Sequence, residues 1–323
     1  MTHSRYASSR RAFLAQAGAL GIAAGIGTGI GTGICGGIGA RPARAASGGI
    51  LGRAIPKTGE RLPVIGMGTW ITFNVGNDAA LRAGRAKVLE TFFARGGGMV
   101  DSSPMYGSSE AVIGHCLGRL ADKGSLFSAT KVWTPFKWLG VKQMEESERL
   151  WGTKRFDLMQ VHNLLDWDAH LETLQAWKAE GRIRYTGVTT SHGSRHEEMA
   201  EIMTGQPIDF VQFTYNILDR EAEARLLPLA AERGLGVIVN RPFQGGALFD
   251  RFAQHPLPGW AAEIDCANWA QLFLKFAVSH PAVTCAIPAT SRVDHMRENM
   301  GACYGRLPDA AMRARMIRHV ESL

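Results

Sequence analysis

The sequence predicts a single α/β domain of the (β/α)8 TIM-barrel class. From about residue 63 onward, short β-like runs alternate with amphipathic stretches of helical periodicity, which is typical of a parallel sheet covered by helices. Eight such runs can be counted, and each is followed by a helix-like stretch. A doubly wound sheet would normally carry a glycine-rich fingerprint after its first strand, and none follows residues 64–68.

The expected strands are spaced along the whole chain after residue 63. They are residues 64–68, 99–102, 127–132, 158–162, 185–189, 210–214, 236–239 and 284–288. The helix-like stretches between them carry start and stop signals. For example, Asp219 precedes an expected helix over residues 220–233, and Gly234 follows it.

The first 45 residues are expected to be a twin-arginine (Tat) signal peptide rather than part of the fold. Arg10 and Arg11 precede a glycine-rich, mildly apolar stretch, and residues 43–45 form an Ala-Arg-Ala cleavage site. This order predicts export by the Tat machinery to the periplasm, with residues 46–323 as the mature barrel domain and no membrane association after processing. An uncleaved membrane anchor is the alternative, because small residues recur at the spacing that lets helices pack in lipid. These residues are Gly21, Gly25, Gly29, Gly33 and Gly37.

Charge and cysteine content exclude two classes of function. The chain has 36 basic and 29 acidic residues, but five arginines lie in the first 45 residues, where no acid occurs. Without those five, 31 basic residues face 29 acidic ones, and no basic stripe remains to bind nucleic acid. The five cysteines show no metal-ligand spacing, so neither a metal site nor a disulfide framework is expected.

Polar residues stand at the ends of three consecutive expected strands. Asp101 ends the second strand, Lys131 lies near the end of the third, His162 ends the fourth, and Tyr106 follows the second in a loop. Each alone has an ordinary structural role available, such as capping or packing. A lysine near the end of an apolar strand is unfavourable unless a carboxylate pairs with it, and Asp101 is the available carboxylate. Because barrel enzymes act at the carboxyl ends of their strands, these four residues are the candidate site.

Several motifs resemble the aldo-keto reductase family in order and spacing. They are residues 99–110 (MVDSSPMYGSSE), 129–131 (ATK), 157–162 (DLMQVH), 181–188, 211–216 and 287–291, followed by Glu298 and Asn299. The likeness extends from about residue 62 to residue 299. It implies an oxidoreductase that reduces an aldehyde or ketone with NAD(P)H by hydride transfer.

The resemblance also implies roles for the four candidate residues. Tyr106 would be the general acid that protonates the carbonyl oxygen, and the ammonium of Lys131 would lower the pKa of its phenol. Asp101 would keep Lys131 charged and oriented. His162 would hydrogen-bond the substrate oxygen.

The resemblance places the cofactor along the remaining strand ends. The expected contacts are Gln212, Thr189, Thr190 and Arg241 for the nicotinamide half, and Thr290, Ser291, Arg292, Glu298 and Asn299 for the adenosine half. Arg292 is the expected partner of a 2′-phosphate, since a guanidinium matches phosphate oxygens.

Three departures from the family pattern affect these contacts. Asn240, followed by Arg241, replaces a tyrosine that commonly stacks on the nicotinamide, and Thr190 replaces an asparagine. Ala289 replaces a lysine that often binds the 2′-phosphate. The expectation of NADPH as cofactor therefore rests on Arg292, and NADH remains possible.

Aromatic residues are expected on the rim beside the candidate site. Trp70 and Trp133, with Phe136 and Trp138, would form an apolar wall suited to hydrophobic carbonyls, although rim aromatics also serve in packing. The long segment 243–266 could be a loop that covers the site.

Three other functions remain open from the sequence. Lys131 could form an imine in a Schiff-base lyase, although Asp101 would raise its pKa and disfavour that chemistry. The chain could also be a non-catalytic subunit that binds a nicotinamide cofactor. A metal hydrolase is disfavoured, because the i, i+4 pair His192 and His196 lacks an accompanying HExxH or HxH motif. The sequence predicts neither the physiological substrate nor the oligomeric state.

Overall fold

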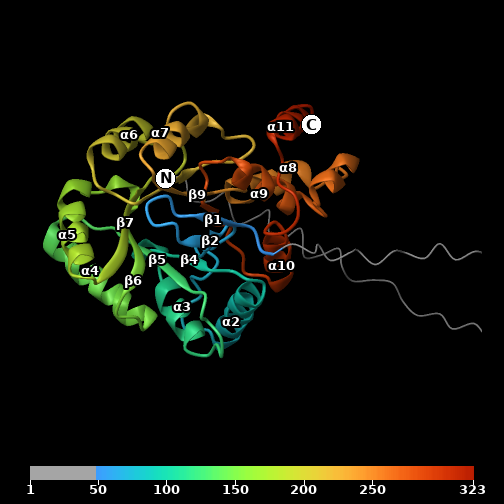
Figure 1. Cartoon of the computed structure of the whole chain (residues 1–323). Coiled ribbons are helices and arrows are strands. Elements are labelled where there is room, and N and C mark those ends of the chain that lie inside the picture. The colour runs from blue at the N-terminus through green and yellow to red at the C-terminus, as the bar shows by residue number, and fades with distance from the viewer. Residues whose placement is uncertain (1–48) are drawn as a thin grey trace, which may run out of the picture. The chain divides into compact units, whose positions relative to one another are not determined.

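A parallel eight-stranded sheet forms the centre of the fold (Figure 1). The computed structural model describes residues 49–323. The strand order is β10-β9-β8-β7-β6-β5-β4-β3, so neighbours in the sheet are neighbours along the chain. Bridges from Ile65 to Ala286 and from Gly68 to Ala289 join the two edges. The sheet is thus a nearly closed barrel, and the predicted α/β barrel class is confirmed.

Each expected strand overlaps an observed one. The bounds are β3 Met67–Gly68, β4 Met99–Asp101, β5 Phe127–Val132, β6 Phe156–Val161, β7 Ile183–Thr189, β8 Phe210–Thr214, β9 Gly236–Asn240 and β10 Cys285–Ala286. Strands β5 and β8 are buried along their whole length, because the barrel interior covers one face and the helices cover the other.

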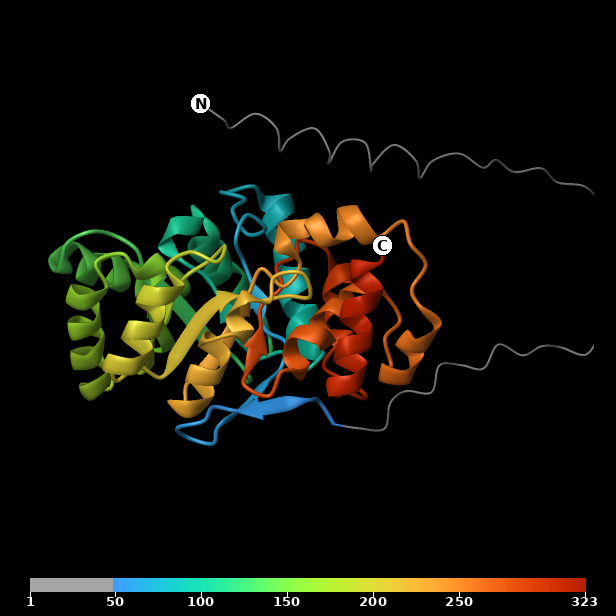
Figure 2. The ribbon, with the colours of Figure 1, turned by 90° about the horizontal axis from the view of Figure 1, so that it is seen from above.

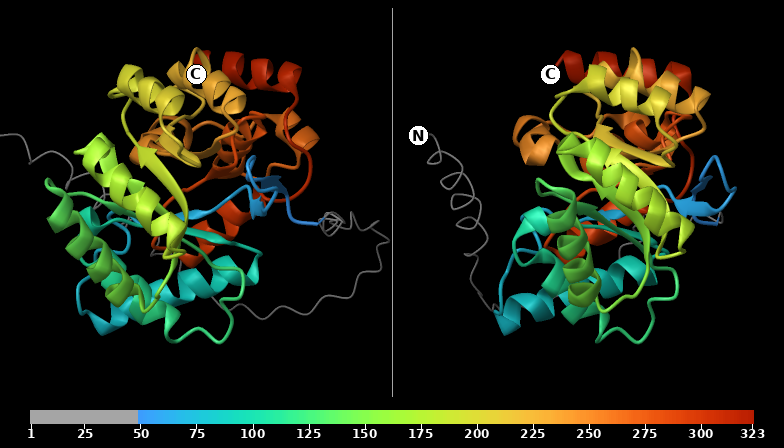
Figure 3. Two further views of the ribbon diagram at one scale, coloured as in Figure 1. Left: turned by 60° about the vertical axis from the view of Figure 1, so that its left-hand side comes forward. Right: turned by 90° about the vertical axis from the view of Figure 1, so that its left-hand side faces the viewer.

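Helices surround the barrel, most of them on its outer face (Figure 3). They are α2 Ala79–Ala94, α3 Ser109–Leu117, α4 Lys137–Trp151, α5 Trp167–Ala179, α6 His196–Gly205, α7 Leu226–Glu232, α8 Ala247–Phe252, α9 Trp269–Ser279, α10 Val293–Gly301 and α11 Ala310–Glu321. Side-chain caps start several of them. Asp78, for example, accepts a hydrogen bond from the Leu81 amide at 2.8 Å at the start of α2.

A short hairpin closes the amino end of the barrel. Strand β1 (Gly52–Ala54) pairs antiparallel with β2 (Arg61–Pro63), and Figure 2 shows this hairpin at one end of the barrel. Ile55 and Leu62 pack there against interior residues such as Phe127 and Phe210, which begin β5 and β8. The amino end of the barrel is therefore filled with apolar side chains. A catalytic site is expected at the carboxyl ends of the strands.

The helix expected over residues 220–233 is wrong in its extent. The chain forms a short 3₁₀ helix, Glu221–Glu223, and then α7, which begins only at Leu226 with Arg225 as its N-cap residue. Pro228 supplies a physical reason, because proline has no amide hydrogen and its ring clashes with the carbonyl four residues earlier. A continuous helix through Ala224 is thus blocked, and Asp219 does not cap α7.

The segment 243–266 is not an extended loop. It contains α8 and two 3₁₀ helices, Gln244–Gly246 and Gly259–Ile264, and it buries Leu248 and Phe252 in the core. Figure 2 shows α8 at the end of the barrel opposite the β1–β2 hairpin. The segment is therefore a folded helical insertion at the carboxyl end.

The expected Tat signal peptide lies outside the described residues. Within residues 49–323, no helix is both long and apolar enough to cross a membrane. The cysteines Cys116, Cys266, Cys285 and Cys303 are free and buried. No group of three or more potential metal ligands occurs in this part of the chain.

Candidate active site

The strand register brings the predicted residues to one end of the barrel. Asp101, the last residue of β4, pairs with Gly68 of β3 and with Ala129 of β5. Lys131 of β5 pairs with Gln160 of β6. His162 directly follows β6, and Tyr106 lies on a short 3₁₀ helix, Pro104–Tyr106, after β4. The four residues expected to carry the chemistry therefore come together.

A buried ion pair lies at the centre of this group. The Lys131 ammonium lies 2.5 Å from Asp101 Oδ2 and donates to the carbonyl oxygen of Ser102 at 2.7 Å. Both side chains are almost completely inaccessible. The other carboxylate oxygen, Asp101 Oδ1, accepts hydrogen bonds from the amide nitrogens of Gln160 and Gln212, each at 3.1 Å. The pair is thus held by four hydrogen bonds, which offset the penalty of burying two charges.

The surroundings keep Lys131 charged. Burial alone would lower its pKa, but the charges of Asp101 and Tyr106 and hydrogen bonds with both raise the pKa above its ordinary value. An ammonium that keeps its proton is a poor nucleophile toward a carbonyl. This electrostatic environment therefore disfavours the Schiff-base alternative.

Tyr106 lies next to this ammonium. The 3₁₀ helix that carries it begins at Pro104, and Ser103 Oγ caps it by accepting a hydrogen bond from the Met105 amide at 3.1 Å. Lys131 Nζ lies 5.3 Å from the centroid of the Tyr106 ring. The Tyr106 and His162 rings meet edge to face, with centroids 5.6 Å apart and planes at 84°.

The direction of the Tyr106 pKa shift differs from the sequence-based expectation. Burial raises the pKa of the phenol, and Asp101 raises it further, whereas the charge and hydrogen bond of Lys131 lower it. The net pKa is raised, because burial is the largest influence. Lys131 thus acts in the expected direction but offsets burial only in part.

His162 is held neutral. Its side chain is buried, with only 6% exposed, and Nδ1 lies 2.8 Å from Ser103 Oγ. Burial, assisted by the charge of Lys131, lowers the pKa of His162 to about 2. The imidazole therefore carries one proton, not two, throughout the neutral pH range.

The buried histidine should make stability depend on pH. Unfolded His162 takes up a proton near its ordinary pKa of 6.5, whereas folded His162 does so only near pH 2. The contribution of neutral His162 to the free energy of unfolding is complete above pH 6.5. We expect the free energy of unfolding to fall by about 1.4 kcal/mol per pH unit as the pH drops below that value. Urea denaturation of the wild type and of His162→Asn should show a shallower decline in the variant. Identical slopes would contradict this prediction.

Most of the residues expected around the nicotinamide make hydrogen bonds to other parts of the protein. Gln212 is buried and anchored to Asp101. Thr189 Oγ1 accepts a hydrogen bond from the Asn163 amide at 3.1 Å. Thr190 Oγ1 donates to the Ser194 carbonyl at 2.5 Å, so its hydroxyl proton is already used.

The carboxyl end of β9 carries Asn240 and not an aromatic residue that could stack on a nicotinamide. Asn240 donates to the Thr190 carbonyl and accepts from Thr214 Oγ1, both at 2.8 Å. It therefore links the carboxyl end of β9 to those of β7 and β8. Arg241 has a positive φ of 50°, and its carbonyl oxygen accepts a hydrogen bond from Asn216 at 3.3 Å.

The residues expected to bind the adenosine half surround the start of α10. Thr290 Oγ1 accepts a hydrogen bond from the Arg292 amide at 3.1 Å, while Ser291 is exposed. Farther along the helix, Glu298 is partly exposed and Asn299 is buried. Sequence reasoning missed Asp294, whose carboxylate receives the Arg292 guanidinium, with Nε to Oδ1 at 3.0 Å and a second bond from Nη2 to Oδ2.

Large apolar side chains are exposed on the loops after β3, β4 and β5. Trp70 is 44% exposed and Trp133 is 39% exposed. The same loops and the start of α4 also expose Ile71, Met105, Phe136 and Trp138. The exposed apolar residues thus lie on the loop that carries Tyr106 and on the segments after the two neighbouring strands, and the role of the aromatic ones as a substrate wall stays a prediction.

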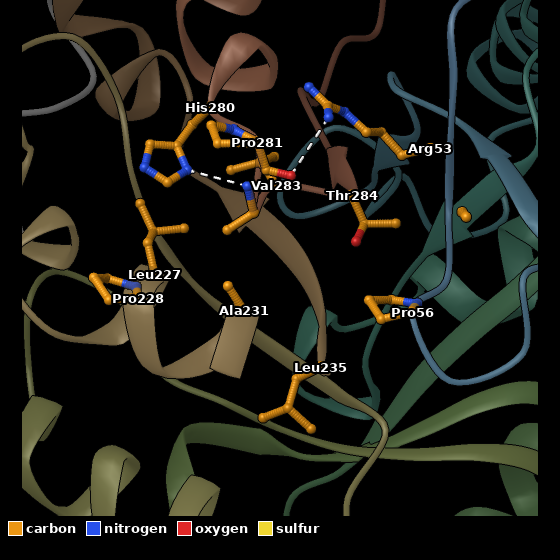
Figure 4. A pocket seen from close by; sticks show the side chains of 12 residues that line it. Arg53, Pro56, Leu227, Pro228, Ala231, Leu235, His280, Pro281, Val283 and Thr284 are labelled. Carbon is orange, nitrogen blue, oxygen red and sulfur yellow. Dashed lines mark hydrogen bonds between the residues drawn. The ribbon is translucent and has the colours of Figure 1, made fainter. Parts of the chain in front are cut away.

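A cavity of about 330 Å³ lies away from these residues (Figure 4). It is lined mainly by apolar side chains from the β1 region, α7 and the turn before β10. Arg53 at its edge donates to the carbonyl of Pro281 at 3.4 Å. None of the predicted site residues lines it, so the candidate active site is the carboxyl end of the barrel.

Several known proteins are similar to this chain in sequence. The sequence model of the Aldo/keto reductase family matches residues 64–316. An uncharacterized oxidoreductase of Schizosaccharomyces pombe is 27% identical over 190 residues, which cover 57% of this chain and 60% of the relative. The NADH-specific methylglyoxal reductase of Escherichia coli is 26% identical over 269 residues, covering 66% of this chain and 80% of the relative. The chain thus spans less than two thirds of the first relative and four fifths of the second.

A solved structure is similar over most of the barrel. The aldo/keto reductase of Klebsiella pneumoniae in complex with NADP and acetate is 25% identical, with a TM-score of 0.70, and the match covers 84% of this chain and 95% of that one. The family model covers well over half of the chain, and the barrel matches a solved reductase. This chain therefore belongs to the aldo/keto reductase family of NAD(P)H-dependent oxidoreductases.

Proposed function

We propose that this protein reduces an aldehyde or ketone, with Tyr106 as the general acid. The observation that carries the proposal is the buried ammonium of Lys131, held by Asp101 and lying 5.3 Å from the Tyr106 ring. Tyr106 would give its proton to the carbonyl oxygen, and Lys131 would stabilise the phenolate that remains. Asp101 would keep the ammonium charged and fixed.

The remaining polar groups fit a bound nicotinamide cofactor. When bound, such a cofactor supplies a hydride to the carbonyl carbon. Gln212 Nε2 is anchored on Asp101, which leaves Oε1 of the same side chain to accept from a carboxamide. At the other end, the first amides of α10 and the side chains of Thr290 and Ser291 suit phosphate oxygens. Thr189 Oγ1 accepts a hydrogen bond from the Asn163 amide, so its own proton can be donated to the cofactor. Thr190 already donates its hydroxyl proton to Ser194, so it could only accept a hydrogen bond from the cofactor.

The rim residues support an apolar substrate. Trp70 and Trp133 expose large aromatic surfaces on the loops after β3 and β5, which flank β4, and such surfaces gain most from covering an aromatic or aliphatic chain. We infer that carbonyls carrying such chains are reduced more efficiently than small polar ones.

The direct test combines cofactor binding with turnover. NADPH and NADH are titrated by quenching of tryptophan fluorescence, and cofactor oxidation is followed with a panel of aromatic, aliphatic and polar aldehydes. Binding together with turnover is the expected result. Binding without turnover would replace this proposal by the non-catalytic subunit, and failure to bind either nucleotide would refute both.

Cofactor preference should depend on the pair formed by Arg292 and Asp294. Asp294 occupies the Nε and Nη2 donors of Arg292, which form one edge of the guanidinium that a 2′-phosphate could use, and its negative charge repels phosphate. We expect Asp294→Asn to tighten NADPH binding about tenfold, with little change for NADH, because about 1.4 kcal/mol of repulsion and competition is removed. Arg292→Ala should weaken NADPH binding by a similar factor.

Arg297→Ala is the matched control for this prediction. It removes an exposed positive charge from the same helix at a position with no expected cofactor contact. Equal changes in NADPH and NADH affinity in Asp294→Asn would show that Asp294 does not affect recognition of the 2′-phosphate.

We also infer that the protein is exported through the Tat pathway with residues 1–45 as its signal. The support is the Arg10-Arg11 pair, the glycine-rich apolar stretch and the Ala-Arg-Ala site. Replacement of both arginines by lysine should retain the full-length chain in the cytoplasm. Unchanged fractionation would refute export by this route.

A further inference from the structure

A serine in the loop between Asp101 and Tyr106 contacts the candidate histidine. Ser103 is completely buried, and its Oγ takes part in two hydrogen bonds. It accepts from the Met105 amide at 3.1 Å, and it lies 2.8 Å from Nδ1 of His162. The proposed mechanism gives Ser103 no role, yet these contacts determine which ring nitrogen of His162 carries the proton.

The proton inventory of the two side chains favours one arrangement. Neutral histidine has one N–H group, and a serine hydroxyl has one proton to donate. If Nδ1 carried the histidine proton, both Nδ1 and the Met105 amide would donate to Ser103 Oγ. The hydroxyl proton would then lack an acceptor among the contacts recorded for Ser103 in residues 49–323.

The reverse arrangement gives the Ser103 hydroxyl, the Met105 amide and Nδ1 of His162 a partner each. Ser103 Oγ accepts from the Met105 amide and donates its own proton to Nδ1 of His162. Nδ1 is then an acceptor, so the single imidazole proton must lie on Nε2. Buried hydroxyl groups strongly favour arrangements in which each donor has an acceptor.

We propose that Ser103 is a positioning residue that fixes His162 as the Nε2–H tautomer, so that His162 donates a hydrogen bond to the carbonyl oxygen of the substrate. This inference rests on the proposed function for its consequence. With the other tautomer, the Nε2 lone pair would face the lone pairs of the carbonyl oxygen. With the Nε2–H tautomer, the bond strengthens as negative charge develops on that oxygen during reduction.

The tautomer can be measured without turnover. In protein labelled with ¹⁵N-histidine, the His162 ring signals are assigned by their absence from His162→Asn. The expected wild-type spectrum at neutral pH has a protonated Nε2 and an unprotonated Nδ1. A protonated Nδ1 would overturn the proposal, whether or not the protein reduces carbonyls.

Variants of Ser103 test the consequence for catalysis. Ser103→Ala should produce a mixture of tautomers and lower kcat/KM about tenfold, less than the 10² to 10³ expected for removing an oxyanion donor outright. Dissociation constants for the cofactor should stay within about twofold, since Ser103 contacts His162, which is proposed to bind the substrate and not the cofactor. Ser103→Thr keeps the hydroxyl and should restore both the tautomer and most of the activity.

Ser109→Ala is the matched control. Ser109 is also buried, and within residues 49–323 the one bond recorded for its hydroxyl is to Ser102 Oγ at 3.1 Å, so removing that hydroxyl should change neither the tautomer nor kcat/KM. If Ser103→Ala fails to fold, Ser103→Cys, with a similar size and a weak donor, provides the same comparison. An unchanged tautomer and unchanged kcat/KM in these variants would refute the proposal. The Nε2–H tautomer in a protein without turnover would refute the proposed function instead.

Discussion

Tyr106→Phe is expected to lower carbonyl reduction by about 10² to 10⁴-fold, the range typical of losing a general acid. The ring remains, so packing against His162 and the position of Lys131 should be preserved. Only the transferable proton is removed. The measurement is steady-state oxidation of NADPH or NADH with an aldehyde that the wild type reduces, alongside the dissociation constant of each cofactor, which should stay within about twofold.

The pH profile of the wild type provides a second check on Tyr106. Since burial raises the pKa of this phenol above its ordinary value of 10, the proton should remain available through neutral and mildly alkaline pH. Activity that depends on Tyr106 should be lost only as the pH rises through that raised pKa.

Tyr304→Phe serves as the control for the loss of a hydroxyl. Tyr304 donates to the Arg95 carbonyl at 3.0 Å and contacts none of the candidate residues, so turnover should not change. Tyr106→Phe with near wild-type kcat would remove Tyr106 from the mechanism.

The sequence predicted the barrel well, because its strands are buried on both faces. Such strands form uninterrupted apolar runs, as in residues 236–239 (GVIV), which are buried throughout. In a parallel barrel every strand ends at the same rim. The positions of Asp101, Lys131 and His162 at strand ends were therefore enough to predict that they meet.

Contacts within loops could not be predicted in the same way. Arg292 and Asp294 are two residues apart, a spacing that places side chains on different sides of a helix. They meet because Arg292 is an N-cap residue in an extended conformation, with φ −118° and ψ 137°. Similarly, the contact between Ser103 and His162 depends on the backbone of the short 3₁₀ helix after β4.

The direction of the Tyr106 pKa shift also could not be predicted from the sequence. The motif identifies a lysine that lowers the pKa of the phenol, but the depth of burial decides the net direction. Burial depends on the packing of several loops together, which no single motif specifies.

Removing Lys131 should affect both stability and catalysis. Lys131→Met leaves the Asp101 carboxylate buried without its counter-charge, and we expect a loss of about 3–5 kcal/mol in the free energy of unfolding. Turnover should fall at least as far as in Tyr106→Phe, since the phenolate loses its stabilising charge. Urea denaturation and cofactor oxidation measure the two effects separately.

The double variant Asp101→Asn/Lys131→Met separates stability from chemistry. It removes both charges together, so it should be more stable than Lys131→Met while remaining inactive. Lys275→Met is the matched control, because Lys275 is also fully buried but donates to the carbonyls of Ile264 and Arg306 instead of a carboxylate. That variant should lose stability and keep its turnover per folded molecule. If the destabilisation in the double variant equalled the sum of the two single variants, Asp101 and Lys131 would be energetically independent, and Asp101 could not be what holds the lysine charged beside Tyr106.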